Sequence, residues 1–144
     1  MPSKLKIYIA KKMIDLFNNL IMKKARKDYR FRVFTQDFKA KIQISIKDDS
    51  INRYITFDGD GGITYSQGKT SDPDGVIIFR SIKDATLFIR NFGDIYEGML
   101  ENRFETKGNI NILLKYIFLT SFINPKKKIN IEGLNQEVIN EFNK

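Results

Sequence analysis

Histidine and cysteine, two residues that carry much of enzyme chemistry, do not occur among the 144 residues of this chain. Their absence excludes a Ser-His-Asp triad, a thiol nucleophile and a Cys/His zinc site. Catalysis would have to use carboxylates, lysine or tyrosine. Asp72 and Asp74 flank Pro73 in a turn, and nothing apolar in the local sequence predicts a raised pKa for either carboxyl. We expect both to be structural and the protein to be non-catalytic.

Two glycine-containing segments approach ligand-binding loops without meeting their spacing. Gly62–Thr70 ends in Gly-Lys-Thr, but five residues separate its glycines where a phosphate-binding P-loop has four. A strand is predicted after it, whereas a P-loop must open a helix. In Asp58–Gly62, EF-hand spacing would put Ile63 and Lys69 where glycine and glutamate are needed. We expect turns at both places, with no metal ion and no cofactor.

The elements that would position a binding site begin with an amphipathic helix over Leu5–Ile21, whose apolar residues recur every three to four positions. Its apolar arc is wider than packing on one side requires. The pattern fits a core helix lying across a sheet, and it also fits a helix on a membrane surface. We treat residues 1–40 as a basic N-terminal helical extension.

Positive charge is concentrated at this end of the chain. The net charge is +8, and residues 1–41 hold 12 Lys and Arg against 3 Asp and Glu. Such a surface attracts an anionic membrane, nucleic acid or an acidic partner. The candidate docking residues for a membrane or a partner enzyme are Lys23, Lys24, Arg26 and Lys27.

Aromatic residues alternate with arginines directly after this basic run, at Tyr29, Phe31 and Phe34. That composition is typical of a stacking platform for single-stranded nucleic acid. Alternating apolar residues near the start of a sheet are more often part of the core. We keep nucleic-acid binding as the weakest of the functional alternatives.

Alternation of apolar and polar residues predicts a three-stranded antiparallel meander over Lys41–Gly68. The next strand, Val76–Phe79, is apolar on both faces, so something apolar should cover each face. Ser81 predicts the start of a helix, Arg103–Lys107 a fifth strand, and Asn109 the cap of a long apolar helix ending at Ile123. Residues 124–144 predict a C-terminal amphipathic helix.

From about Lys41 to Ile123 this order of elements resembles the sterol carrier protein type 2 family. The resemblance rests on Phe57-Asp58-Gly59, Ile63–Gly68, Pro73-Asp74, Ser81, Gly93, Lys107-Gly108-Asn109 and Ile110–Ile123. Two positions depart from the family pattern: Asn102-Arg103-Phe104 replaces a usual Gly-Lys-Leu, and Asn109 replaces Asp. The expected fold is therefore α+β, a five-stranded, largely antiparallel sheet covered by helices, in a single domain with residues 41–123 as its core.

The resemblance implies an apolar tunnel between sheet and helices that holds a fatty acyl, sterol or isoprenoid-like chain without covalent chemistry. The residues expected to line it are Phe88, Phe92, Ile95, Met99, Leu113, Leu114, Ile117 and Phe118. From composition alone, the apolar helix over Ile110–Ile123 could equally be plain core or a homodimer contact. The alternative function is an accessory or scaffold subunit of a lipid or quinone enzyme. We expect a cytoplasmic protein, because no secretory signal or spanning segment is evident.

Overall fold

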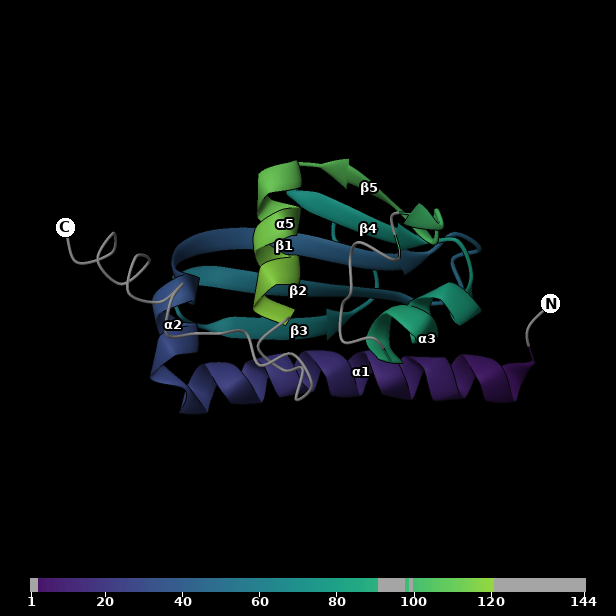
Figure 1. Cartoon of the computed structure of the whole chain (residues 1–144), viewed down its shortest axis with the longest axis horizontal. Helices are drawn as coiled ribbons and strands as arrows, with labels where there is room; N and C mark the ends of the chain where they lie inside the picture. The colour runs from purple at the N-terminus through teal and green to yellow at the C-terminus, as the bar shows by residue number, and fades with distance from the viewer. Residues whose placement is uncertain (1–2, 91–97, 99, 121–144) are drawn as a thin grey trace.

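The computed structural model describes residues 3–90, 98 and 100–120 of the chain. These residues form a five-stranded sheet in the order β3-β2-β1-β4-β5. Its strands are β1 (Gln36–Ile46), β2 (Asn52–Asp60), β3 (Ile63–Gln67), β4 (Gly75–Phe79) and β5 (Phe104–Gly108). The described helices are α1 (Lys4–Lys27), α2 (Tyr29–Thr35), α3 (Ile82–Arg90) and α5 (Ile110–Thr120), arranged as in Figure 1.

The sheet confirms the expected fold class. β1, β2 and β3 form the predicted antiparallel meander, β5 pairs antiparallel with β4, and β4 lies parallel to β1. The meander begins at Gln36, ahead of the boundary expected between residues 40 and 41. The single parallel pair follows from topology: the chain returns to the free edge of β1 after completing the β2–β3 hairpin.

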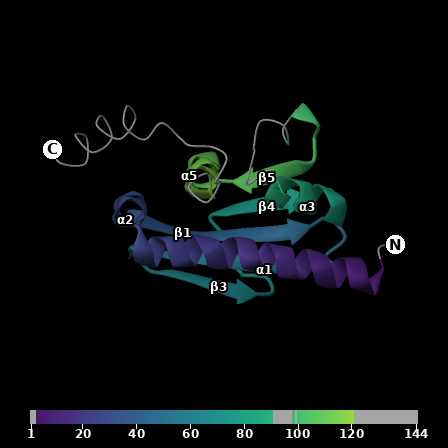
Figure 2. The same cartoon turned by 60° about the horizontal axis from the view of Figure 1, so that its bottom comes forward.

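All described helices contact one face of the sheet. The strand register brings Ala40, Ile42 and Ile44 of β1 to the same face as Ile55 and its neighbours in β2. That face carries buried apolar residues of the strands, including Ile77 and Phe79 of β4. Figure 2 shows α1, α3 and α5 lying over it.

The opposite face of the sheet has no described helix over it. β4 contributes Val76 and Ile78 to this face, and both are half-buried. Their neighbours on β1, Gln43 and Ser45, are buried polar residues that hydrogen-bond each other and the chain around Gly68. The doubly apolar strand is therefore covered by helices on one side and bordered by a polar network on the other.

α1 is part of the core, with Ile14, Phe17 and Ile21 among its buried side chains. Polar contacts of Asp15 set the position of α1 on the sheet. Arg53 of β2 is buried on the helix-covered face, and its Nε donates to Asp15 Oδ1 of α1 at 2.9 Å. Tyr65 of β3 donates its hydroxyl to the same oxygen at 2.6 Å. A buried guanidinium needs a paired carboxylate, so this contact fixes α1 along the β2–β3 side of the sheet.

A second short helix, α2, contains the alternating aromatic residues that follow the basic run. Asp28 ends α1, where its N–H donates to Lys24 O, and caps α2 by accepting from Arg30 N. Three-residue spacing then places Phe31 and Phe34 on the buried side of α2. Tyr29 remains exposed. Two of the three rings of the supposed stacking platform are thus in the core, which removes the geometric basis for nucleic-acid stacking there.

The caps predicted for the two later helices are present. Ser81 Oγ accepts from Asp84 N at the start of α3 and donates to the Asp84 carboxylate. Asn109 Oδ1 accepts from Asn111 N and Ile112 N at the start of α5. Just before it, Gly108 has φ of +87°, and a Cβ there would lie 2.5 Å from Asp74 O. Glycine is therefore required where β5 turns into α5.

We expect Asp15→Asn to lower the free energy of unfolding by about 3–5 kcal/mol, because it removes the carboxylate that pairs buried Arg53. Urea denaturation measures the change. The matched control is Asp49→Asn, whose ion pair with Lys69 is exposed at both side chains and should contribute little measurable stability. Equal losses in the two variants would contradict the role assigned to Asp15.

Candidate lipid-binding site

The residues expected to line a tunnel fall into three groups. Phe88, Leu113 and Ile117 are buried. Leu114 and Phe118 are exposed at 47% and 42%. Phe92, Ile95 and Met99 lie outside the described residues, as does the C-terminal segment 124–144.

Phe88 of α3 is the centre of an aromatic cluster at one end of β4. Its ring centroid lies 5.2 Å from that of Phe79, 5.8 Å from that of Phe104 and 6.2 Å from that of Phe17. These centroid distances suit tilted and edge-to-face ring packing. The cluster joins α1, α3, β4 and β5, so Phe88 already serves the core of the protein.

Leu113 lies at the other end of β4. A Cβ on Gly75 would be 2.7 Å from Leu113 Cδ2, so glycine allows α5 to approach the strand closely. Five residues of strand span about 13 Å between Gly75 and Phe79. The structure thus brings Phe88 and Leu113 over the same strand but to opposite ends of it.

The two sides of α5 differ in burial although both are apolar. Leu113, Tyr116 and Ile117 face the sheet and are buried. Ile110, Leu114 and Phe118 follow each other at four-residue spacing and are 42–50% exposed. The Phe118 ring packs edge-on against Phe34 of α2, with centroids 5.4 Å apart. Composition could not assign these two sides, because nearly every position of the helix is apolar.

A cavity of about 20 Å³ lies between α1, α3, α5 and the sheet, among Phe17, Asn18, Ile77, Phe88 and Tyr116. That volume suits a single water molecule. Two of these residues form a buried polar pair: Tyr116 donates to Asn18 Oδ1 at 2.8 Å, and Asn18 Nδ2 donates to Ile14 O at 2.9 Å. Burial raises the pKa of Tyr116, so its hydroxyl remains a protonated donor at neutral pH.

The sequence interpretation missed α1 as a wall of this region. Phe17 and Asn18 line the cavity from α1, whereas the expected lining came only from residues 88–118. The available signal was the wide apolar arc of the N-terminal helix. Asn18 is a polar residue of that helix, and it is buried at 1% exposure.

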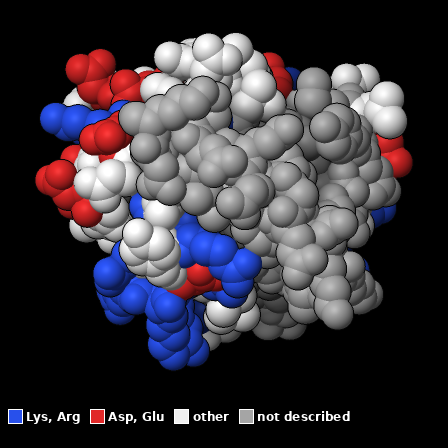
Figure 3. All heavy atoms as spheres, turned by 60° about the vertical axis from the view of Figure 1, so that its left-hand side comes forward, with Lys and Arg blue, Asp and Glu red and all other residues white. Residues whose placement is uncertain are grey.

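The candidate docking residues lie together on the last two turns of α1. Lys23, Arg26 and Lys27 are exposed, and Lys24 forms an ion pair with Asp28 at 3.5 Å. Figure 3 shows Lys and Arg side chains gathered around an acidic one at the lower end of this face. We call Lys23, Lys24, Arg26 and Lys27 the basic corner.

A surface hollow of about 530 Å³ adjoins the basic corner. Arg26 and Arg32 line it, opposite Asp60 and Gly61 of the β2–β3 turn. Arg32 donates to Ala25 O and Arg26 O, and so satisfies the carbonyls at the end of α1. Its guanidinium is therefore structural, while the guanidinium of Arg26 makes no hydrogen bond or ion pair with the described residues.

Neither a metal centre nor a membrane-spanning helix is found in the part of the chain that the structure describes. No group of three or more acidic residues there could hold a metal ion. No helix there has both the length and the hydropathy needed to cross a membrane.

Solved structures share this arrangement of sheet and helices. A structure titled "UbiJ-SCP2 Ubiquinone synthesis protein" aligns over 83% of this chain and 99% of its own, with a TM-score of 0.58 and 12% identity. Sterol carrier protein 2-like 2 from Aedes aegypti aligns over 74% of this chain and 95% of its own, with a TM-score of 0.54 and 11% identity. The chain has the sterol carrier protein 2 fold.

Further matches agree on the fold. A solution structure of palmitated SCP2L2 from Aedes aegypti aligns over 72% of this chain and 90% of its own, at a TM-score of 0.54 and 14% identity. No protein-family model and no curated protein matches the sequence. The resemblance read from the sequence is therefore confirmed for the fold, which at these identities is all that the comparisons establish.

Removing the Tyr116 hydroxyl should destabilise the protein, because Tyr116→Phe leaves buried Asn18 Oδ1 without its donor. We expect a loss of about 1–3 kcal/mol in the free energy of unfolding, measured by urea denaturation. Tyr54→Phe is the control, since the Tyr54 hydroxyl makes no hydrogen bond with the described residues. A Tyr116→Phe variant as stable as the control would show that the polar pair contributes nothing.

Proposed function

We propose that this protein binds an apolar chain, such as a fatty acyl, sterol or isoprenoid-like chain, against the apolar surface of α5 and the end of the sheet that α3 covers, without catalysing a reaction. In this proposal the protein acts in the cytoplasm as a carrier. The observation that carries the proposal is the apolar surface of α5. Leu114 and Phe118 on its outer side remain near half exposed, although exposing apolar area to water is unfavourable by about 25 cal/mol per Å².

The surroundings of α5 support an apolar ligand. Leu114 and Phe118 form one continuous ridge with the ring of Phe34, and Phe88 closes the far end of β4. Pockets for small molecules are mostly apolar with few polar groups. Among the described core residues, Asn18 and Tyr116 are the polar groups nearest to such a chain.

One structural neighbour supports the proposed ligand class. The palmitated Aedes aegypti protein carries a fatty acyl chain according to its title, and it shares this fold at a TM-score of 0.54. Phe92, Ile95 and Met99 complete the proposed lining from the sequence resemblance.

A second candidate is an accessory or scaffold subunit in lipid or quinone metabolism. The observation that favours it is the fold match to a ubiquinone synthesis protein across 99% of that chain. In that role the same apolar site would present a substrate to a partner enzyme, and the basic corner would be a docking surface.

Leu114→Gln should lower lipid content without unfolding the protein, because it places an amide on the proposed ligand surface while changing a side chain that is already 47% exposed. Native mass spectrometry of the purified protein, followed by organic extraction, measures the bound lipid. We expect occupancy to fall at least fivefold, with the thermal midpoint within a few degrees of the parent.

Ile110→Gln provides the matched control on the same helix, since Ile110 is 50% exposed and lies one turn before Leu114, at the β5 end. It should keep its lipid. Absence of extractable lipid from the parent protein, or equal loss in both variants, would rule out the carrier and leave the accessory role.

The basic corner should give weak, salt-sensitive binding to anionic vesicles, because exposed charges are screened beyond about 10 Å at 0.1 M salt. Replacing Lys23, Lys24, Arg26 and Lys27 together by Gln should abolish vesicle sedimentation and leave lipid occupancy unchanged. At about 0.5 M salt the screening length is much shorter than at 0.1 M. Vesicle binding that persists at this salt concentration would contradict an electrostatic contact.

A further inference from the structure

The outer side of α1 carries a row of exposed large apolar residues. Leu5, Ile9, Leu16 and Leu20 are 38–67% exposed. At 100° per residue they lie within about 60° of one another, directly opposite Ile14 and the other buried residues of the helix. Lys12 and Asn19 are exposed between them. We call Leu5, Ile9, Lys12, Leu16, Asn19 and Leu20 the outer stripe.

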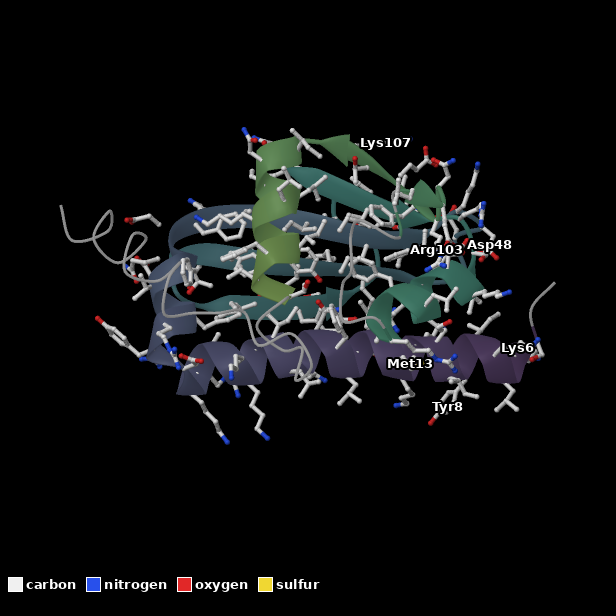
Figure 4. All side chains as sticks on the ribbon, in the orientation of Figure 1. Lys6, Tyr8, Met13, Asp48, Arg103 and Lys107 are labelled. Atoms are coloured by element: carbon white, nitrogen blue, oxygen red, sulfur yellow. The ribbon has the colours of Figure 1, made fainter. Side chains whose placement is uncertain are left out.

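The outer stripe cannot turn inward to bury itself. Asp15 is held by Arg53 at 2.9 Å and by Tyr65 at 2.6 Å, and Asn18 is held by Tyr116. These contacts fix the rotation of α1 about its own axis. Figure 4 shows the exposed Tyr8 pointing from the same side of the helix away from the sheet, and Figure 2 shows this side of α1 uncovered by any described element.

The charge around the outer stripe is of one sign. α1 contains eight Lys and Arg and one acidic residue, Asp15, which is engaged with Arg53 and Tyr65. Lys4 and Lys11 flank the stripe on one side, and Lys6 and Lys24 flank it on the other. Pairing two copies through α1 would place lysines against lysines, which is unfavourable at close range. The lysines around the stripe therefore favour an anionic occupant over a second copy of this chain.

Spacing along the stripe indicates the form of that occupant. Leu5, Ile9, Lys12, Leu16 and Asn19 alternate steps of four and three residues, which is the spacing of a helix–helix seam. Lys12 stands in the middle of this seam, with its Nζ 5.4 Å from the centre of the Tyr8 ring. A cation within a seam is matched by a carboxylate on a partner helix, and one polar residue at such a position sets register.

A membrane fits this pattern less well. A helix lying in a lipid interface presents an apolar face to the acyl chains and keeps its charged residues on the opposite face. In α1 the opposite face is the protein core, and Lys12 interrupts the apolar row itself. We propose that the outer stripe is a docking surface for an acidic amphipathic helix of a partner protein, separate from the proposed lipid site.

The test uses a synthetic 28-residue helix with leucine at a and d, glutamate at e and g, and one glutamate at the a or d position opposite Lys12. Its like charges at e and g oppose self-association. Fluorescence anisotropy gives the affinity, and amide chemical-shift changes map the contact. We expect binding that weakens with salt, with shifts along Leu5–Leu20. A comparison peptide with lysine at e and g should bind at least tenfold more weakly.

The double variant Ile9→Gln/Leu16→Gln should weaken binding of the glutamate peptide at least tenfold while keeping both its fold and its extractable lipid. Tyr29→Gln/Leu100→Gln is the matched control, because both residues are highly exposed apolar side chains outside the stripe, and it should change the affinity less than twofold. Lys12→Glu should weaken binding, and a peptide with lysine at the facing position should restore it.

Several results would overturn the proposal. They are the absence of peptide binding, shifts that map outside α1, and a control variant that loses as much affinity as the stripe variant. Loss of anionic-vesicle binding in the stripe variant, without peptide binding in the parent, would identify a membrane face instead. Dimerisation in sedimentation that the stripe variant abolishes would identify self-pairing. Because lipid extraction is independent of all these measurements, failure here leaves the proposed lipid function unaffected.

Discussion

The pairing of Asp15 with Arg53 determines how the rest of this molecule is assembled. A guanidinium on the covered face of a sheet is unfavourable unless a carboxylate pairs with it. Asp15, which is the one acidic residue of α1, lies at that point and accepts from Arg53. This contact places Ile14, Phe17 and Asn18 against the sheet. It also leaves the opposite side of α1 in solvent, so a single buried ion pair defines both the inner wall of the candidate lipid site and the proposed outer docking surface.

The two proposed surfaces are physically different. The ridge on α5 is apolar, with no charged residue at Leu114 or Phe118, and it suits a ligand that is bound through its apolar surface area. The outer stripe of α1 is bordered by lysines and interrupted by Lys12, and it suits a partner recognised by charge and register. Their location on two different helices would allow the protein to hold a lipid and a partner at the same time.

Much of the architecture was predictable because local signals agreed with it. The alternation in β1, the Ser81 cap of α3 and the Asn109 cap of α5 each depend on neighbouring residues, and all three predictions are confirmed. Partners distant in sequence were not predictable: nothing near Asp15 indicates Arg53, and nothing near Asn18 indicates Tyr116. The expectation of a helical segment over residues 1–40 did not show that α2 is a separate helix, because Tyr29–Phe34 fits both a two-residue and a three-residue period. In α5, apolar residues on every side concealed which of Leu113 and Leu114 meets the sheet.

The contact between Asn18 and Tyr116 joins residues 98 positions apart, and this separation affects folding during synthesis on the ribosome. α1 is synthesised first and has apolar residues on two sides, yet its inner side acquires its partners only when β2, β3 and α5 exist. At about 5–20 residues per second, that interval lasts roughly 5–20 s. During this interval the nascent chain exposes the apolar inner side of α1 to solvent, because its packing partners have not been synthesised. We therefore expect this protein to depend on ribosome-associated chaperones more than other proteins of its size.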